Sequence, residues 1–184
     1  SNLQQQQMDG PAIIIKKGEG IYIEDIDGKR YIEGMSSLWN VNVGYGRKEL
    51  AEIAKEQIEQ LSFSSTFSTY SHEPVIKLAA KIAELTPGDL NTVFFTSGGS
   101  ESNDSAIKLA RHYWNIQDRP ERRKIISRKK AYHGVAMGAT SATGIPEFWK
   151  FAHVSPEFFH VETTSVEEIR KIIEKEGPET IAAF

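Results

Sequence analysis

The second half of this 184-residue chain alternates strand-like segments with amphipathic helical segments. Strands are expected at 93–96, 124–127, 158–161 and 180–184, and helices at 101–116 and 166–175. Strands that alternate with helices line up in parallel, and the helices then cover both faces of the sheet. The sequence therefore predicts an α/β fold with a largely parallel sheet.

The first half is organised differently. Residues 13–35 form extended segments around the turn dipeptide Asp27-Gly28, which predicts a β-hairpin, and apolar spacing predicts helices at 48–60 and from Pro74 to the stop at Pro87-Gly88. Residues 1–10 are interpreted as a tag or disordered tail. We expect a small-domain segment with active-site loops over 11–70 and a large domain over 71–184.

Composition narrows the functional class. The chain has no cysteine, which excludes a disulfide framework and a thiolate metal site, and its net charge is −3. No apolar run approaches the length of a membrane span, so we expect a cytoplasmic protein without a membrane partner. The basic run 119–130 surrounds two isoleucines and lacks interleaved aromatics, and we interpret it as a solvated loop that enters a strand, with no nucleic-acid partner.

One junction combines a strand, two glycines and a helix in "TVFFTSGGSESNDSAIKLA". The start of a helix offers unpaired N–H groups and the positive end of the dipole, and Gly98 and Gly99 let the backbone approach an anion closely. Ser100 can add a hydrogen bond from its hydroxyl. The alternative is a tight turn with Ser100 as a plain N-cap, and the residues of this segment leave both interpretations open. The motifs for nucleoside triphosphates and for dinucleotides are both absent.

The junction resembles the cofactor-phosphate loop of class III aminotransferases, the omega-transaminases, which use pyridoxal 5'-phosphate (PLP) on the type I fold. "MSSLWNVNVGYG", "RKKAYHGVAMGATSATG" and "TIAAF" resemble further segments of that family in the same order. Together these motifs cover the chain from about Ile13. The resemblance implies an incomplete PLP-transferase type I fold, with the N-terminal small-domain hairpin and the first half of the large domain.

Site residues follow from the resemblance. Gly98, Gly99 and Ser100 would hold the PLP phosphate, and Tyr132 would stack on the pyridine ring, with a core tyrosine as the alternative. Leu38 and Trp39 would line the substrate pocket, where simple anchoring of the loop is equally open. Phe67 would help to shape the site of a partner subunit, and Ser102 stands where the family more usually has alanine.

Transamination also needs a Schiff-base lysine and an acidic partner for the pyridine nitrogen, which in this family lie beyond a strand like "TIAAF". Lys108, Lys129 and Lys130 do not match the lysine position, so we expect no catalytic residue in this chain. The implied reaction transfers an amino group from an amine or amino acid to an oxo acid or aldehyde in a full-length homodimer, and this chain alone should be inactive. The alternatives are a non-catalytic PLP- or phosphate-binding interaction protein and another phosphate-binding α/β enzyme.

Overall fold

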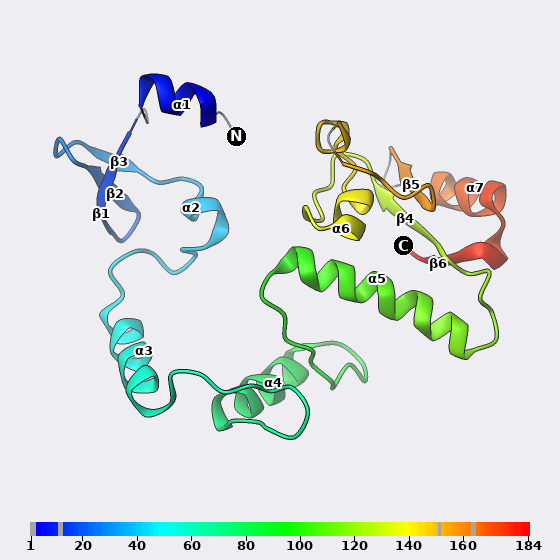
Figure 1. Cartoon of the computed structure of the whole chain (residues 1–184), viewed down its shortest axis with the longest axis horizontal. Helices are drawn as coiled ribbons and strands as arrows, with labels where there is room; N and C mark the ends of the chain where they lie inside the picture. The colour runs from blue at the N-terminus through cyan, green and yellow to red at the C-terminus, as the bar shows by residue number, and fades with distance from the viewer. Residues whose placement is uncertain (1–2, 11–12, 151, 163–164) are drawn as a thin grey trace. The chain divides into compact units, whose positions relative to one another are not determined.

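The structure is a computed structural model that describes residues 3–10, 13–150, 152–162 and 165–184 (Figure 1). The chain forms two compact units, Ser1–Lys81 and Ile82–Phe184, and the boundary falls within helix α4 (Glu73–Leu85). Each unit has its own sheet. The expected domain boundary at residue 70 stays a prediction.

The sheet of the first unit is an antiparallel meander of β1 (Ile15–Glu19), β2 (Tyr22–Asp25) and β3 (Arg30–Ile32). The β2–β3 hairpin turns through Gly28, whose φ of +83° favours glycine. Asp25 fixes this turn, because its carboxylate accepts hydrogen bonds from the amides of Asp27 and Lys29 and from the Tyr31 hydroxyl. The predicted hairpin is confirmed, and β1 extends it by one strand.

Among the described residues of this unit, four helical segments lie wholly or partly within it. They are α1 (Leu3–Asp9), α2 (Ser36–Trp39), α3 (Lys48–Leu61) and the start of α4. The predicted helices at 48–60 and from Pro74 correspond to α3 and α4. The glutamine-rich run in α1 has good helix propensity, but α1 buries no residue, and the assignment of 1–10 to a tail stays a prediction.

The sheet of the second unit is parallel, in the order β5 (Phe158–Val161), β4 (Lys124–Arg128), β6 (Ile181–Ala183). Helix α7 (Val166–Glu176) packs on one face, where Ile126, Val161 and Ile181 form the core. Helices α5 (Gly99–Ile116) and α6 (Met137–Ala142) contact the sheet from the other side, where the Ser127 hydroxyl donates to the Ala142 carbonyl. Short 3-10 turns follow at Pro146–Trp149 and Pro178–Thr180. The prediction of a parallel sheet covered on both faces is confirmed.

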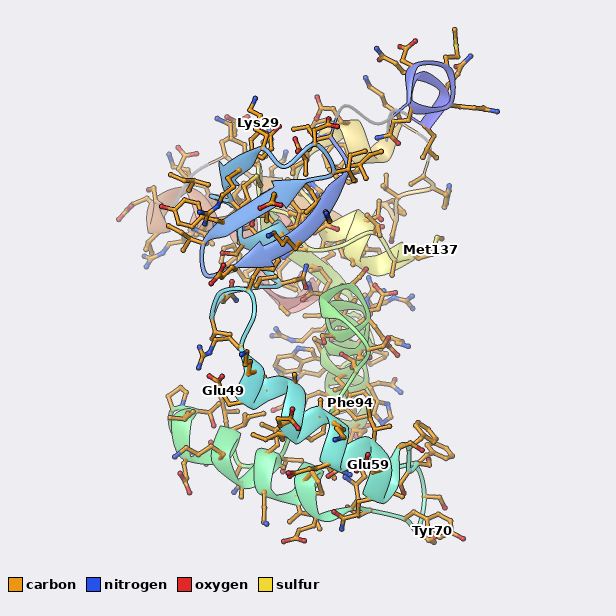
Figure 2. The ribbon with its side chains drawn as sticks, turned by 90° about the vertical axis from the view of Figure 1, so that its left-hand side faces the viewer. Lys29, Glu49, Glu59, Tyr70, Phe94 and Met137 are labelled. Carbon is orange, nitrogen blue, oxygen red and sulfur yellow. The ribbon has the colours of Figure 1, made fainter. Side chains whose placement is uncertain are left out.

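The predicted strand at 93–96 is wrong. This segment is irregular, and the side chain of Phe94, labelled in Figure 2, is 74% exposed. A strand exists only through hydrogen bonds to a neighbour, and within the described residues no segment pairs with it. In the same ranges, no helix is long and apolar enough to cross a membrane.

Candidate functional site

The first turn of α5 presents several backbone N–H groups as hydrogen-bond donors. Gly98 precedes the helix in an extended conformation, and α5 begins at Gly99. Within the described residues, the amides of Gly99, Ser100 and Glu101 have no hydrogen-bond partner. Neither Gly98 nor Gly99 has an atom within 4 Å of the place where a Cβ would stand, so an anion can approach the backbone there.

Two hydroxyls orient the peptide bond between Gly98 and Gly99. The Gly98 carbonyl accepts from Thr96 Oγ1 at 3.2 Å, from Ser102 Oγ at 3.1 Å and from the Ser102 amide at 3.0 Å. Because a trans peptide is planar, the Gly99 N–H points opposite to this carbonyl. The Gly99 amide is thereby directed away from the helix. Ser102 takes a direct part in this arrangement through both its hydroxyl and its amide.

Ser100 lies in the first turn and is not the N-cap, so that interpretation of the sequence is wrong. Its Oγ accepts hydrogen bonds from the amides of Val135 at 2.9 Å and Ala136 at 2.7 Å. A hydroxyl has two acceptor lone pairs and one donor hydrogen. With both lone pairs engaged, Ser100 can offer only its hydrogen, and that hydrogen suits an anion.

The loop that contacts Ser100 follows the carboxyl end of β4 and carries Tyr132. The loop comes closest to α5 at Gly134. A glycine is required there, because the φ of Gly134 is +123° and an added Cβ would lie 2.5 Å from Ser100 Oγ. Tyr132 is 54% exposed and its ring lies 5.5 Å from that of Phe148, with a tilt of 52°. The alternative of a core tyrosine is therefore wrong. Tyr132 and Ser100 lie on the same edge of the sheet, as ligand-binding groups of open α/β sheets do.

Three polar side chains that the sequence did not single out hold this loop in place. Asn103 Nδ2 donates to the His133 carbonyl at 2.6 Å, and Asp104 Oδ1 accepts from the Ala139 amide at 2.6 Å. Thr143, which is fully buried, accepts from the His133 amide and donates to the Gly134 carbonyl. Asn103 and Asp104 follow Ser100 by three and four residues, which places all three on one face of α5. That spacing is the signal from which they could have been found.

Glu101 brings a negative charge to the same helix start. Its carboxylate accepts from the amide and the hydroxyl of Ser97, and the hydrogen bond from the hydroxyl lowers the pKa of Glu101. A carboxylate in the first turn stabilises the helix dipole. The Ser97 amide is thus engaged and is not available to a ligand.

In the first unit, Leu38 and Trp39 lie in a left-handed helical turn. Ser36, Ser37, Leu38 and Trp39 have φ values of 48°, 49°, 57° and 67°. The Trp39 and Asn40 amides close i to i−4 hydrogen bonds to the carbonyls of Met35 and Ser36. A left-handed turn costs about 1–2 kcal/mol per non-glycine residue, so this one stores roughly 4–8 kcal/mol of strain. Their side chains are 62% and 69% exposed, and Phe67 is also highly exposed.

A pocket of about 190 Å³ lies between α5 and strands β4 and β6. It is mainly apolar, with Asn103 and His133 among its lining residues, and it includes neither Gly98–Ser100 nor Tyr132. In the part of the chain that the structure describes, no group of three or more histidine, aspartate and glutamate side chains could hold a metal ion.

Of the three lysines considered, Lys129 is paired with Glu162. The basic run makes several contacts within its own unit: Arg122 lies over the Trp114 ring, Arg123 pairs with Glu157, and Lys124 pairs with Glu176.

These features define an α/β chain in which an exposed aromatic ring, Tyr132, lies on the loop that contacts a helix start with backbone amides unpaired among the described residues. The sequence matches the profile of the family described as Aminotransferase class-III over residues 3–184, and the chain belongs to that family. Among curated relatives, putrescine–pyruvate aminotransferase of Pseudomonas aeruginosa is 35% identical and the probable aminotransferase Rv3329 of Mycobacterium tuberculosis is 40% identical. The matches cover 94% and 92% of this chain and 42% and 40% of those proteins.

The solved structures that resemble this chain are also transaminases. A transaminase from the marine bacterium Virgibacillus is 59% identical with a TM-score of 0.95, and an (S)-enantioselective omega-transaminase from Thermomicrobium roseum is 48% identical with a TM-score of 0.94. Each covers 100% of this chain, which spans 43% and 45% of their lengths. The fold is therefore that of the transaminases, and the chain spans less than half the length of these relatives.

Proposed function

We propose that this chain forms the phosphate-binding and ring-stacking part of a PLP-dependent class III aminotransferase. The full-length protein then transfers an amino group from an amine or amino acid to an oxo acid or aldehyde. The observation that carries the proposal is that, within the described residues, the amides of Gly99–Glu101 have no hydrogen-bond partner and the Ser100 hydroxyl has only its hydrogen left to donate.

The residues fit the cofactor on three counts. A phosphate needs several donors within a small space, and the first turn of α5 supplies three amides and one hydroxyl. It also needs room, which Gly98 and Gly99 provide because a Cβ at either position would meet no neighbour within 4 Å. A flat heteroaromatic ring needs an aromatic surface, and Tyr132 is the half-exposed ring on the loop that contacts Ser100.

In this proposal the amides of Gly99 and Ser100 bind the phosphate, and Ser100 donates its hydroxyl hydrogen to it. Tyr132 covers one face of the ring and excludes water from it. When bound, PLP supplies an electron sink for the carbon that carries the amino group. Leu38 and Trp39 line the pocket of the amino donor. The Schiff-base lysine and the acidic partner of the pyridine nitrogen would come from another part of the full-length protein, as the family resemblance implies.

The proposed partners are a small amino donor and an oxo acceptor. We also propose a homodimer and a cytoplasmic location for the full-length protein. Family membership supports the dimer, and the absence of cysteine is compatible with a reducing compartment.

The test uses the full-length protein encoded by the gene. PLP affinity is measured for wild type, Tyr132→Leu and the control Tyr113→Leu, because Tyr113 is a comparably exposed tyrosine (56%) near the opposite end of α5. Loss of the stacked ring should weaken PLP binding about tenfold, while Tyr113→Leu leaves it unchanged. Amino transfer to pyruvate is measured in parallel. Binding without amino transfer from any donor would favour a non-catalytic PLP-binding protein, and equal affinity of both variants would contradict the stacking role.

A further inference from the structure

The Ser100 hydroxyl joins the start of α5 to the loop that carries Tyr132. Its oxygen accepts hydrogen bonds from the amides of Val135 at 2.9 Å and Ala136 at 2.7 Å, which engages both of its lone pairs. Within the described residues no acceptor is found for the hydrogen of this hydroxyl. An anion at the start of α5 can therefore accept that hydrogen from the same group that holds the loop.

Two further contacts hold the loop on α5 without the help of this hydroxyl. Asn103 Nδ2 donates to the His133 carbonyl and Asp104 Oδ1 accepts from the Ala139 amide, each at 2.6 Å. Ala139 belongs to α6, which packs against α5 (Figure 1). These contacts keep the loop near α5 whether or not an anion is bound. Among the contacts described, those of Ser100 are the ones whose strength depends on a ligand.

Hydrogen bonds that share a group polarise one another. A hydroxyl that donates to an anion becomes a stronger acceptor, and bonds to an ionised group are about twice as strong as neutral ones. A phosphate that accepts the Ser100 hydrogen should therefore strengthen both hydrogen bonds from the loop amides. The side chains of Tyr132, Val135 and Met137 are exposed, so apolar burial contributes little to the order of this loop and its hydrogen bonds matter more.

We infer that Ser100 is a positioning residue for Tyr132, because a phosphate bound at the start of α5 tightens the loop and so fixes the ring that stacks on the cofactor. The identity of the ligand as PLP rests on the proposed function, whereas the link itself rests on the hydrogen bonds of Ser100. Coupling between two parts of a site is reciprocal, so a flat ring held against Tyr132 should raise the affinity for phosphate by the same factor. We expect a factor of about five, at the low end of typical couplings.

The coupling is first measured without catalysis, on the full-length protein freed of PLP. Calorimetry gives the concentration of inorganic phosphate that saturates each variant. In the wild type, saturating phosphate should slow hydrogen exchange of the Val135 and Ala136 amides about fivefold. In Asn103→Ala both amides should exchange faster, but the fivefold effect of phosphate should remain, because this variant loosens the loop and keeps the Ser100 hydroxyl.

Ser100→Ala should abolish the effect of phosphate on these two amides. Ser105→Ala is the matched control and should behave as the wild type, because Ser105 lies on α5 and its side chain makes no hydrogen bond within the described residues. A merely structural Ser100 would give faster exchange in Ser100→Ala with the fivefold effect of phosphate still present. That result would overturn the inference.

The reverse direction uses 3-hydroxy-2-methylpyridine, a flat ring with neither an aldehyde nor a phosphate arm. Its affinity for the wild type should rise about fivefold at saturating phosphate, and this gain should be lost in Ser100→Ala. Bound phosphate that changes neither the exchange nor the ring affinity would overturn the coupling. No phosphate binding would refute the proposed phosphate site and the coupling with it. Slowed exchange in a protein that shows no amino transfer with PLP would confirm the coupling and refute only the proposed activity.

Discussion

Gly134→Ala is the substitution that most directly tests how the loop carrying Tyr132 is held on α5. At this position a Cβ would lie 2.5 Å from Ser100 Oγ and 2.7 Å from Ser100 Cα and Cβ. These contacts include Ser100 Cα, an atom of the helix backbone that cannot turn aside, so the loop must move. When it moves, the amides of Val135 and Ala136 lose their acceptor, which is Ser100 Oγ.

The expected cost has two parts. An alanine with φ near +123° costs about 1–3 kcal/mol in backbone strain. The two lost hydrogen bonds contribute about 1 kcal/mol each. The sum is roughly 3–5 kcal/mol, which corresponds to an increase of about 10²- to 10⁴-fold in the opening equilibrium of the loop.

Hydrogen exchange of the full-length protein measures this opening directly. The amides of Val135 and Ala136 should exchange about 10²- to 10⁴-fold faster in Gly134→Ala than in the wild type. Gly98→Ala is the control, because Gly98 is extended and an added Cβ meets nothing within 4 Å, so these two amides should keep their protection. Exchange within tenfold of the wild type in Gly134→Ala would refute the close packing of this loop on Ser100.

Three further predictions concern the same unit. Ser100→Ala leaves the amides of Val135 and Ala136 without an acceptor, so it should destabilise the loop by about 1–3 kcal/mol, measured by urea unfolding. It should also weaken the binding of inorganic phosphate, measured by calorimetry. An unchanged stability together with an unchanged phosphate affinity would contradict the role of Ser100. The Ser97 hydroxyl lowers the pKa of Glu101, so the stabilisation of the start of α5 should be complete above the ordinary value of 4.5 and be lost as the pH falls below it. An NMR titration of the Ser97 amide checks this, and Glu101→Gln should abolish the dependence. Burial lowers the pKa of His160 in the folded protein. As the pH falls, His160 therefore takes up its proton first in the unfolded protein, so stability should fall as the pH drops below 6.5. In His160→Gln the midpoint of unfolding should change little with pH over that range. A midpoint that still falls with pH as steeply as in the wild type would show that burial of His160 is not the cause.

Elements with a strong local pattern could be predicted from the sequence. The apolar spacing of α3 and α7 gave their bounds to within one residue, and β5 has the predicted bounds. The segment 93–96 has strand-forming residues but no neighbour to pair with among the described residues, and pairing is a non-local property. Helix α6 was missed because "MGATSA" has no apolar period, although Ala139 and Ala142 are buried.

The candidate site shows the same division. The glycines and the start of α5 could be located from sequence, because they depend on local backbone chemistry. The contact of Ser100 with amides 35 and 36 residues away could not, since it depends on how α5 meets the sheet. The left-handed turn was also hidden, because a run of serine, leucine and tryptophan carries no signal for positive φ.

The central claim is that the start of α5 and Tyr132 form one PLP site, and a crystal structure of the full-length protein with PLP tests it most directly. We expect the phosphate to lie within hydrogen-bond distance of the Gly99 and Ser100 amides and of Ser100 Oγ, with the pyridine ring against Tyr132. PLP bound with its phosphate elsewhere, while the amides of Gly99–Glu101 face solvent, would contradict it.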